Sequence, residues 1–144
     1  MRSFFLSLFL LIFCSAQASA QPERVITREQ LPAAAQQFLS EYFPSADIAT
    51  VSEQRSFPRR EYDVYFHNGT HIEFSAEGQW QELSSREALP QGIVPRSIAA
   101  YVSEHYPMQP VVHIERRSKG WEVELANGME MKFDSHFQLI EIDD

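Results

Sequence analysis

The sequence predicts an α+β fold in which two helices pack on one face of an antiparallel sheet. Two observations lead to this prediction. The segment FLSEYFP at residues 38–44 returns in the pattern YVSEHYP at residues 101–107. The segment YDVYFHNGTHIEF at residues 62–74 returns as WEVELANGMEMKF at residues 121–133. Self-similarity of this kind is typical of a chain that builds the same structural unit twice.

The first pair of segments predicts two short amphipathic helices of about three turns each. Residues 30–44 and 93–107 align at an offset of 63, and their apolar positions follow spacings of 4, 3 and 1, which mark one helix face. A proline near the start of each segment suits the first helical turn, where no amide hydrogen bond is lost. Pro44 and Pro107 are expected to end the helices, because proline cannot continue their hydrogen bonding.

The second pair of segments predicts two β-hairpins. Both segments alternate apolar and polar residues, and both contain the turn signal Asn-Gly, with the glycines at Gly69 and Gly128. A two-residue loop would place polar residues on the apolar face. A three-residue loop over residues 67–69 pairs Val64 with Ile72 and keeps the faces consistent. We therefore expect a type I turn with a glycine bulge, and a positive φ at both glycines.

Two further alternating strands complete each unit. One precedes each hairpin, near residues 46–54 and 110–117, and one follows it, near residues 79–83 and 138–142. Each unit is then a helix followed by four antiparallel strands. Together the two units predict one long sheet, or two abutting sheets, with both helices on one face and the other face open to water or to a partner.

The first twenty residues have the pattern of a secretory signal peptide. Arg2 precedes an apolar run from Phe4 to Phe13, and small residues end at Ala20, the expected cleavage site. This run is shorter than the ~20 apolar residues of a membrane helix, and no later run is long enough. We expect a periplasmic or secreted protein without an integral membrane segment after cleavage. Its expected parts are the signal peptide (1–20) and two repeats of one compact domain (21–85 and 86–144).

Composition argues against several classes of protein. The only cysteine, Cys14, lies in the leader, so the mature chain is expected to have no disulfide and no thiol ligand. From residue 21 onward, 11 basic and 20 acidic residues give a net charge of −9. Nucleic acid is therefore not expected as a partner, because binding to phosphates draws on an excess of Lys and Arg. The chain has five glycines and no G-x-S-x-G motif, and we expect neither an enzyme nor a cofactor.

The order of these motifs resembles a known family. Leu-Pro before the first helix, aromatic-Pro after it, the hairpin around Asn-Gly and the EGQW at residues 77–80 resemble the PepSY-like domains of exported bacterial proteins. Those domains are grouped by fold with beta-lactamase-inhibitor-like proteins. The resemblance covers nearly all of residues 26–142, with Phe137 a departure where the first unit has Gly78. It implies tandem repeats in the bacterial envelope without a known catalytic centre, and protein or peptidase binding or inhibition through the sheet face and loops.

The open face of the sheet is the first candidate site. The predicted pairing places these residues on it: Asp63, Tyr65, His71, Glu73, Glu122, Glu124, Glu130 and Lys132. Two cross-strand pairs, Asp63 with Glu73 and Glu124 with Glu130, would set like charges opposite each other, at a cost of up to about 1 kcal/mol each. Glu122 opposite Lys132 is a favourable pair. The face is either a solvated surface that keeps the protein soluble or an acidic surface for a cation or a basic partner.

The loops between the first two strands of each unit are the second candidate site. They read RSFPRRE (55–61) and RRSKGW (116–121), and they gather six of the eleven cations of the mature chain. Segregated charge attracts anionic partners, although exposed hairpin tips also tolerate almost any residue. The candidate binding residues of the two sites are Arg55, Phe57, Arg59, Arg60, Tyr65, His71, Arg116, Arg117, Lys119 and Glu124.

The sequence thus predicts an exported, non-enzymatic binding module. It would act on an unknown envelope or secreted protein through the open face and the basic hairpin tips. The five histidines show no short ligand spacing, so no metal site is expected, and Trp80 and Trp121 are expected in the core. Two alternatives remain open: a small periplasmic hydrolytic or metal-dependent enzyme, and a structural envelope protein that self-associates through a sheet edge.

Overall fold

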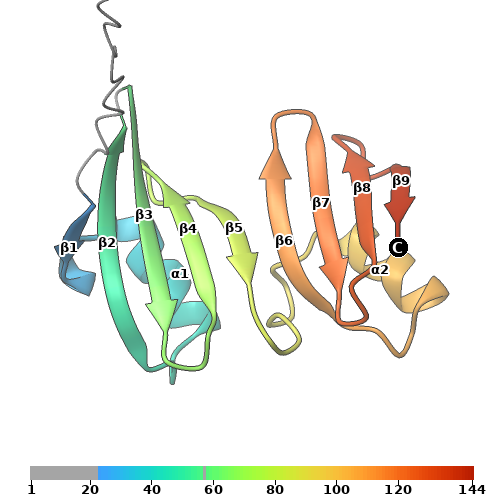
Figure 1. Ribbon diagram of the computed structural model, residues 1–144, viewed down its shortest axis with the longest axis horizontal. Helices are drawn as coiled ribbons and strands as arrows, with labels where there is room; N and C mark the ends of the chain where they lie inside the picture. Colours follow the sequence, from blue (N-terminus) through green and yellow to red (C-terminus); the bar gives the residue numbers. More distant parts are fainter. Residues whose placement is uncertain (1–22, 57) are drawn as a thin grey trace, which may run out of the picture.

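A single antiparallel sheet of nine strands forms the frame of the structure (Figure 1). The computed structural model describes residues 23–56 and 58–144. The strands are hydrogen-bonded in the order of the chain, from β1 to β9, and every neighbouring pair is antiparallel. The predicted α+β class is confirmed, and the choice between one sheet and two is settled in favour of one. The predicted signal peptide and its cleavage site at Ala20 lie outside the described residues.

The same order of elements occurs twice along the chain. The elements are β1 (Arg24–Ile26), a 3-10 helix (Arg28–Gln30), α1 (Ala33–Tyr42), β2 (Ile48–Ser56), β3 (Arg59–Phe66), β4 (His71–Ser75), β5 (Trp80–Ser84), α2 (Arg96–His105), β6 (Val111–Arg117), β7 (Gly120–Leu125), β8 (Glu130–Asp134) and β9 (Leu139–Asp143). We call α1 to β5 the first half and α2 to β9 the second half. The sequence did not predict β1, because three residues are too few to show alternation.

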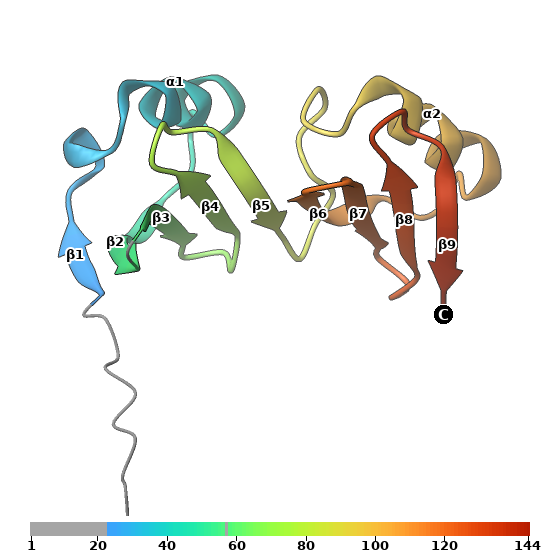
Figure 2. The ribbon, with the colours of Figure 1, turned by 90° about the horizontal axis from the view of Figure 1, so that it is seen from above.

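Both helices lie on the same side of the sheet, as predicted (Figure 2). Pro32 and Pro95 occupy the N-cap positions, one residue before the first turn in which they were expected. The fixed φ of proline suits the entry to a helix, and its missing amide costs nothing there. No helix in the described part of the chain is both long and apolar enough to cross a membrane.

The core lies between the helices and the sheet and runs unbroken through both halves. One residue from each of six neighbouring strands faces the helices, and the strand registers align these residues in a row. The row consists of Val64, Ile72, Leu83, Ile114, Val123 and Met131, all of which are fully buried. Burial of each such side chain contributes roughly 1.5–3 kcal/mol. The step from Leu83 to Ile114 joins the two halves into one hydrophobic layer.

The predicted hairpin geometry is confirmed in both halves. Val64 pairs with Ile72 in the first hairpin, and the second hairpin has the corresponding register. The amide of Gly69 donates to the carbonyl oxygen of Phe66 at 3.0 Å and closes the turn. The φ angles of Gly69 and Gly128 are +89° and +87°, in the left-handed region that favours glycine.

The turns that precede β5 and β9 explain the departure at Phe137. Gly78 and Phe137 both have a left-handed φ, of +83° and +62°. A Cβ atom on Gly78 would lie 2.8 Å from the amide nitrogen of Ala35 and 2.8 Å from the Cβ of Pro32, so the packing against α1 requires glycine. Phe137 instead directs its ring towards Trp121, with the ring centroids 6.0 Å apart.

Alanine substitutions at two glycines separate backbone strain from steric overlap. Gly128→Ala meets no atom within 4 Å, so we expect it to cost only the ~1–2 kcal/mol of a left-handed alanine. Gly78→Ala has nearly the same φ and adds the overlap with α1, which brings a further ~1–3 kcal/mol. Urea unfolding of both variants measures the difference. Equal losses of unfolding free energy would contradict this packing of α1.

Candidate functional site

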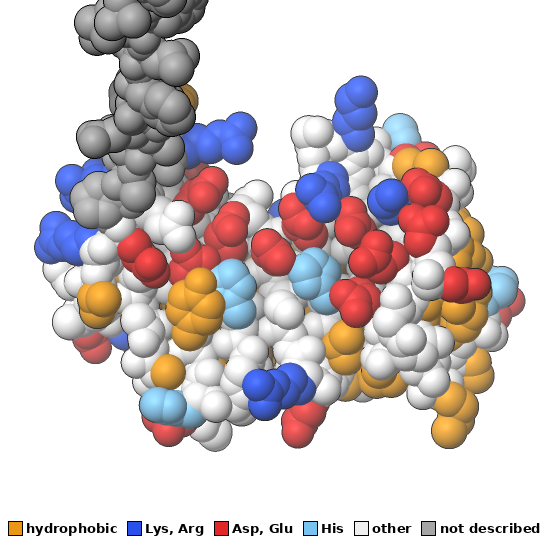
Figure 3. Space-filling model, in the orientation of Figure 1, with side chains coloured by type: hydrophobic (Ala, Val, Ile, Leu, Met, Phe, Trp, Pro, Cys, Tyr) orange, Lys and Arg blue, Asp and Glu red, His pale blue; other side chains and the backbone are white. Residues whose placement is uncertain are grey.

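The face of the sheet opposite the helices carries an unbroken row of carboxylates. The registers of β3 to β7 place five acidic residues directly beside one another: Asp63, Glu73, Glu82, Glu115 and Glu122. We call these residues the carboxylate row. Residues that face each other across neighbouring strands have Cβ atoms ~4.5–5.5 Å apart. Acidic side chains accordingly gather across the middle of this face (Figure 3).

At the second-half end of the carboxylate row, one guanidinium offsets part of the charge of two carboxylates. Arg117 Nη2 lies 3.0 Å from Glu115 Oε2 and 3.0 Å from Glu122 Oε2. Lys132 stands opposite Glu122, as predicted, but its Nζ binds Glu141 Oε2 at 3.0 Å. The predicted register of Glu122 opposite Lys132 is therefore confirmed. The predicted ion pair between them is wrong, because Glu122 binds Arg117 and Lys132 binds Glu141.

At the other end of the row, Asp63 is buried. It is only 4% exposed, so the solvated surface, one of the two interpretations left open by the sequence, is wrong for this part of the face. Its carboxylate accepts hydrogen bonds from His71 Nε2 at 2.6 Å and from Gln54 Nε2 at 3.0 Å. The ring of His71 stacks on Tyr65 with centroids 4.4 Å apart. The structure thus brings the predicted site residues Tyr65 and His71 together around Asp63.

The surroundings of His71 and Glu73 shift both of their pKa values upward. The hydrogen bond to Asp63 raises the pKa of His71, and burial opposes this shift. Burial raises the pKa of Glu73 to about 7, with further contributions from Glu61, Asp63 and Glu82. Near neutral pH, Glu73 is therefore partly protonated, and a cation placed on the row would favour its ionised form.

A compact group of possible metal ligands lies where the two halves meet. One ligand atom each from Glu82, His113 and Glu115 lies within 4.8 Å of the others. Burial raises the pKa of Glu115, and Arg117 opposes that shift. The sequence prediction missed this group, because only the pairing of β5 with β6 brings His113 near carboxylates. A predicted pairing of β5 with β6 that sets the apolar Leu83 opposite Ile114 would have revealed this group, since the same register sets Glu82 opposite Glu115.

Most cations of the hairpin tips are held by the protein's own side chains. Arg55 and Arg60 both direct Nε to Oε1 of the buried Glu53, at 3.3 Å and 3.1 Å. Within the described residues, Arg59 and Lys119 have no ion-pair partner. Phe57 lies outside the described residues. The last predicted residue, Glu124, lies on the open face opposite Glu130 and beside His113.

Arg116 lies between two tryptophans, one from each half of the chain. Its guanidinium carbon is 4.0 Å from the ring centroid of Trp80 and 5.1 Å from that of Trp121. Burial lowers the pKa of this guanidinium, which stays charged because an unperturbed arginine titrates far above neutral pH. This cation–π contact stabilises the junction on the helix side, so Arg116 has a structural role there.

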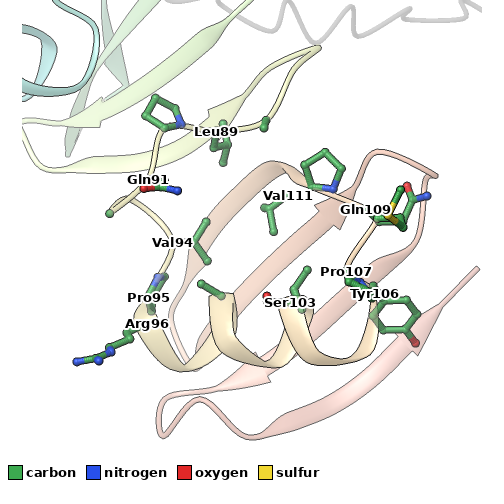
Figure 4. A pocket seen from close by; sticks show the side chains of 17 residues that line it. Leu89, Gln91, Val94, Pro95, Arg96, Ser103, Tyr106, Pro107, Gln109 and Val111 are labelled. Carbon is green, nitrogen blue, oxygen red and sulfur yellow. The ribbon is translucent and has the colours of Figure 1, made fainter.

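A cavity of about 870 Å³ opens on the helix side, the side of the sheet opposite the carboxylate row. It lies between α2, the segment 88–95 and the segment 106–111 (Figure 4). The only titratable residues in its lining are Arg96 and Tyr106, and most of the others are apolar. In the first half, Gln36 stands where α2 has Ala99, and its amide donates to the carbonyl of Leu31 at 2.9 Å. The smaller alanine leaves room in the second half.

A family model described as "Putative beta-lactamase-inhibitor-like, PepSY-like" matches residues 60–141. This chain belongs to that family. The match starts in β3 and ends in β9, so one copy of the family model spans parts of both halves. The family resemblance noted in the motifs is thereby confirmed, and the division into two PepSY-like repeats stays a prediction. None of the curated proteins that were compared matches the chain.

Three solved bacterial structures share this PepSY-like fold. A protein of the DUF2874 family from Bacteroides vulgatus, described as a putative periplasmic protein, is 37% identical, with a TM-score of 0.84 over 87% of this chain and 99% of that one. A protein from Bacteroides thetaiotaomicron, described as a putative calcium-regulated periplasmic protein, is 37% identical, with a TM-score of 0.82 over 85% and 97%. A protein from B. vulgatus, described as a putative periplasmic protein of unknown function, is 28% identical, with a TM-score of 0.80 over 85% of this chain and 100% of that one.

The raised pKa values predict that stability falls as the pH rises through neutrality. Folded Glu73 keeps a proton that the unfolded chain releases above the ordinary pKa of 4.5, so stability is lost from there up to about pH 7. His71 acts in the same direction. Its contribution is full below its ordinary pKa of 6.5 and is lost as the pH passes the raised value. Thermal unfolding should therefore occur at a lower temperature at pH 8 than at pH 5.

Substituting the carboxylate tests the assignment of this pH dependence. In Glu73→Gln, we expect the fall in Tm between pH 5 and pH 8 to shrink by roughly 3 °C or more. Glu77→Gln, on an exposed turn, is the matched control and should keep the wild-type fall. If Glu73→Gln kept the full wild-type fall in Tm, the raised pKa of Glu73 would be refuted.

Proposed function

We propose that this PepSY-like protein is an exported periplasmic binding protein that acts without catalysis. Its open sheet face would bind a positively charged segment of another envelope or secreted protein. The carboxylate row, continuous over five strands and both halves of the chain, is the observation that carries the proposal. The leader pattern at residues 1–20 and the description of the solved relatives as periplasmic support export.

The charge balance of the row supports a cationic partner. Like charges placed directly opposite each other destabilise a sheet, and the row contains four such contacts in succession. Arg117 offsets only the end at Glu115 and Glu122. Conflicts between local interactions and the fold are concentrated at functional sites in real proteins. A bound Lys or Arg near Glu73 and Glu82 would supply the missing positive charge.

The dimensions of the row fit an extended peptide. Five strands at ~4.8 Å spacing make the row roughly 19 Å long. In an extended segment, alternate side chains point the same way and lie about 6.6 Å apart. A segment with a basic residue at every second position would therefore set about three cations over the five carboxylates.

The location of the titratable groups supports binding rather than catalysis. Active sites usually lie in concave pockets in which titratable side chains converge. Here the carboxylates lie on one side of the sheet, whereas the lining of the 870 Å³ cavity contains no carboxylate and no imidazole. The two features are on opposite faces of the sheet.

A fluorescent peptide with lysine at alternate positions tests the proposal. We expect it to bind the wild type at low salt, with an affinity that falls as the salt concentration rises. The variant Glu73→Gln/Glu82→Gln/Glu115→Gln should bind at least 10-fold more weakly. The control Glu41→Gln/Glu77→Gln/Glu104→Gln changes the net charge by the same amount at exposed positions elsewhere, and should lose less than 2-fold. Equal losses in both variants would mean that net charge alone attracts the peptide.

A second candidate function is calcium binding at the same face. The cluster of Glu82, His113 and Glu115 favours it, and the B. thetaiotaomicron relative is described as calcium-regulated. Calcium takes six to eight oxygen ligands, and Glu73 would add a third carboxylate to the two in the cluster. Imidazole is better suited to zinc, so His113 offers a way to separate the two metals.

Calorimetric titration of the wild type with calcium and with zinc tests this candidate. If calcium binds, Glu82→Gln/Glu115→Gln should weaken its binding at least 10-fold, whereas His113→Gln should leave it within 2-fold. The opposite pattern, with zinc binding lost in His113→Gln and no calcium binding, would reject calcium as the ligand. Glu41→Gln/Glu104→Gln is the control for the change in net charge.

A further inference from the structure

The strand β9 presents an apolar edge of the sheet. Every residue of β9 is exposed, and Leu139, Ile140 and Ile142 are 36%, 65% and 36% exposed. Within the described residues, no strand pairs with the outer side of β9 (Figure 1). Hydrophobic side chains lie along that margin of the molecule (Figure 3). An uncovered edge of this kind is a template for another strand.

The first half of the chain shows which strand covers such an edge. The strands β5 and β9 hold equivalent places, because Leu83 pairs with Ile72 just as Ile142 pairs with Met131. In the first half, β6 covers β5, and Leu83 is fully buried opposite Ile114. The covering strand is thus the first strand of the following half.

The equivalent of β6 in the first half is β2. Val51 pairs with Val64 in β3 just as Ile114 pairs with Val123 in β7. The outer side of β2 is occupied by β1, and Ile26 of β1 lies opposite Val51. Ile26 thus holds the place on β2 that Leu83 of β5 holds on β6, opposite Ile114. The strand β1 has only three residues.

We propose that copies of this chain associate head to tail, with β9 of one copy replacing β1 on β2 of the next. The register follows from the pairing of β5 with β6. Ile142 would lie opposite Val51, Glu141 opposite Ser52, and Asp143 opposite Thr50. Ile142 would then be buried in the position that Ile26 leaves.

An unsatisfied hydroxyl supports this register. Ser52 is fully buried, and its Oγ has no hydrogen-bond partner within the described structure. On one side its neighbour is Val25 of β1, which offers no acceptor in its side chain. On the other side stands Asp63 of β3, whose carboxylate accepts from His71 and Gln54 and not from Ser52. Buried polar atoms are normally hydrogen-bonded. In the exchanged arrangement, the carboxylate of Glu141 would stand opposite Ser52 and could accept from its hydroxyl.

Charge favours this contact over a symmetric pairing of two β9 strands. On the open face, β9 presents Glu141 and Asp143, and an antiparallel partner β9 would set these carboxylates against each other, which is destabilising. The strand β2 presents the neutral Ser52 and Thr50 instead. A contact between two different edges does not close on itself, so association would yield chains of copies rather than a symmetric dimer.

Disulfide trapping tests the register in the full chain with Cys14→Ala, so that each introduced cysteine is the only thiol. Ser52→Cys and Glu141→Cys are prepared separately, mixed and oxidised. We expect a covalent dimer from the mixture and none from either variant alone. A Glu82→Cys/Glu115→Cys chain, which links the equivalent pair within one molecule, is the positive control. A dimer of Glu141→Cys alone would show β9–β9 pairing and overturn the proposal. The proposal would also be overturned if the mixture stayed monomeric while the control chain formed its internal disulfide.

Sedimentation velocity provides a test that needs no cysteine. The weight-average sedimentation coefficient of the wild type should rise with concentration. Ile142→Asp should stay monomeric, and its Tm is measured alongside to show that the variant is folded under the conditions of the experiment. Ile26→Asp weakens β1, the competitor of β9, and should shift association to at least 10-fold lower concentration. The proposal would be overturned if the wild type and Ile26→Asp both stayed monomeric at the highest concentration. It would also be overturned if Ile142→Asp associated as strongly as the wild type.

Discussion

The pairing of Leu83 with Ile114 is the contact on which the rest of the structure depends. It joins the two halves into one sheet and one hydrophobic layer, and both side chains are fully buried. Because strand residues alternate between faces, this register also sets Glu82 against Glu115 on the other side. The magnitudes explain why the sheet accepts that repulsion. A buried aliphatic side chain contributes roughly 1.5–3 kcal/mol, whereas a like-charge pair costs up to about 1 kcal/mol. The packing of the core thus sets where the members of the carboxylate row lie relative to one another.

The two ends of the carboxylate row differ in how their charge is compensated. At the second-half end, Arg117 binds two carboxylates, and its charge does not change near neutral pH. At the first-half end, compensation comes from His71 and from the proton on Glu73, both of which titrate. The charge of this end therefore depends on pH, and a bound cation would displace the proton from Glu73.

Local patterns were enough to predict the helices, the hairpins and the faces of the strands. The alternation around Val64 and Ile72 and the Asn-Gly signals fix the loop length, because only one parity keeps polar residues off the core side. The contacts of the long charged side chains could not be predicted in this way. Arg55 and Arg60 bend back to Glu53, a carboxylate on the core-facing side of β2, and alternation alone gives no reason to expect a buried glutamate there. The cluster at His113 likewise depends on pairing between residues from different halves.

Comparison of equivalent positions shows that the two halves share a backbone and differ in surface chemistry. Glu53 in β2 corresponds to Arg116 in β6, since each precedes the hairpin tip and faces the helix side. Glu53 is covered by two arginines, whereas Arg116 is covered by two tryptophans. The neighbouring strand explains the difference. Beside β6 stands β5, which contributes Trp80, whereas beside β2 stands β1, which places Arg24 opposite Glu53. The halves are therefore not two copies of one binding site. The surface that they build jointly, the carboxylate row, spans their junction and requires both.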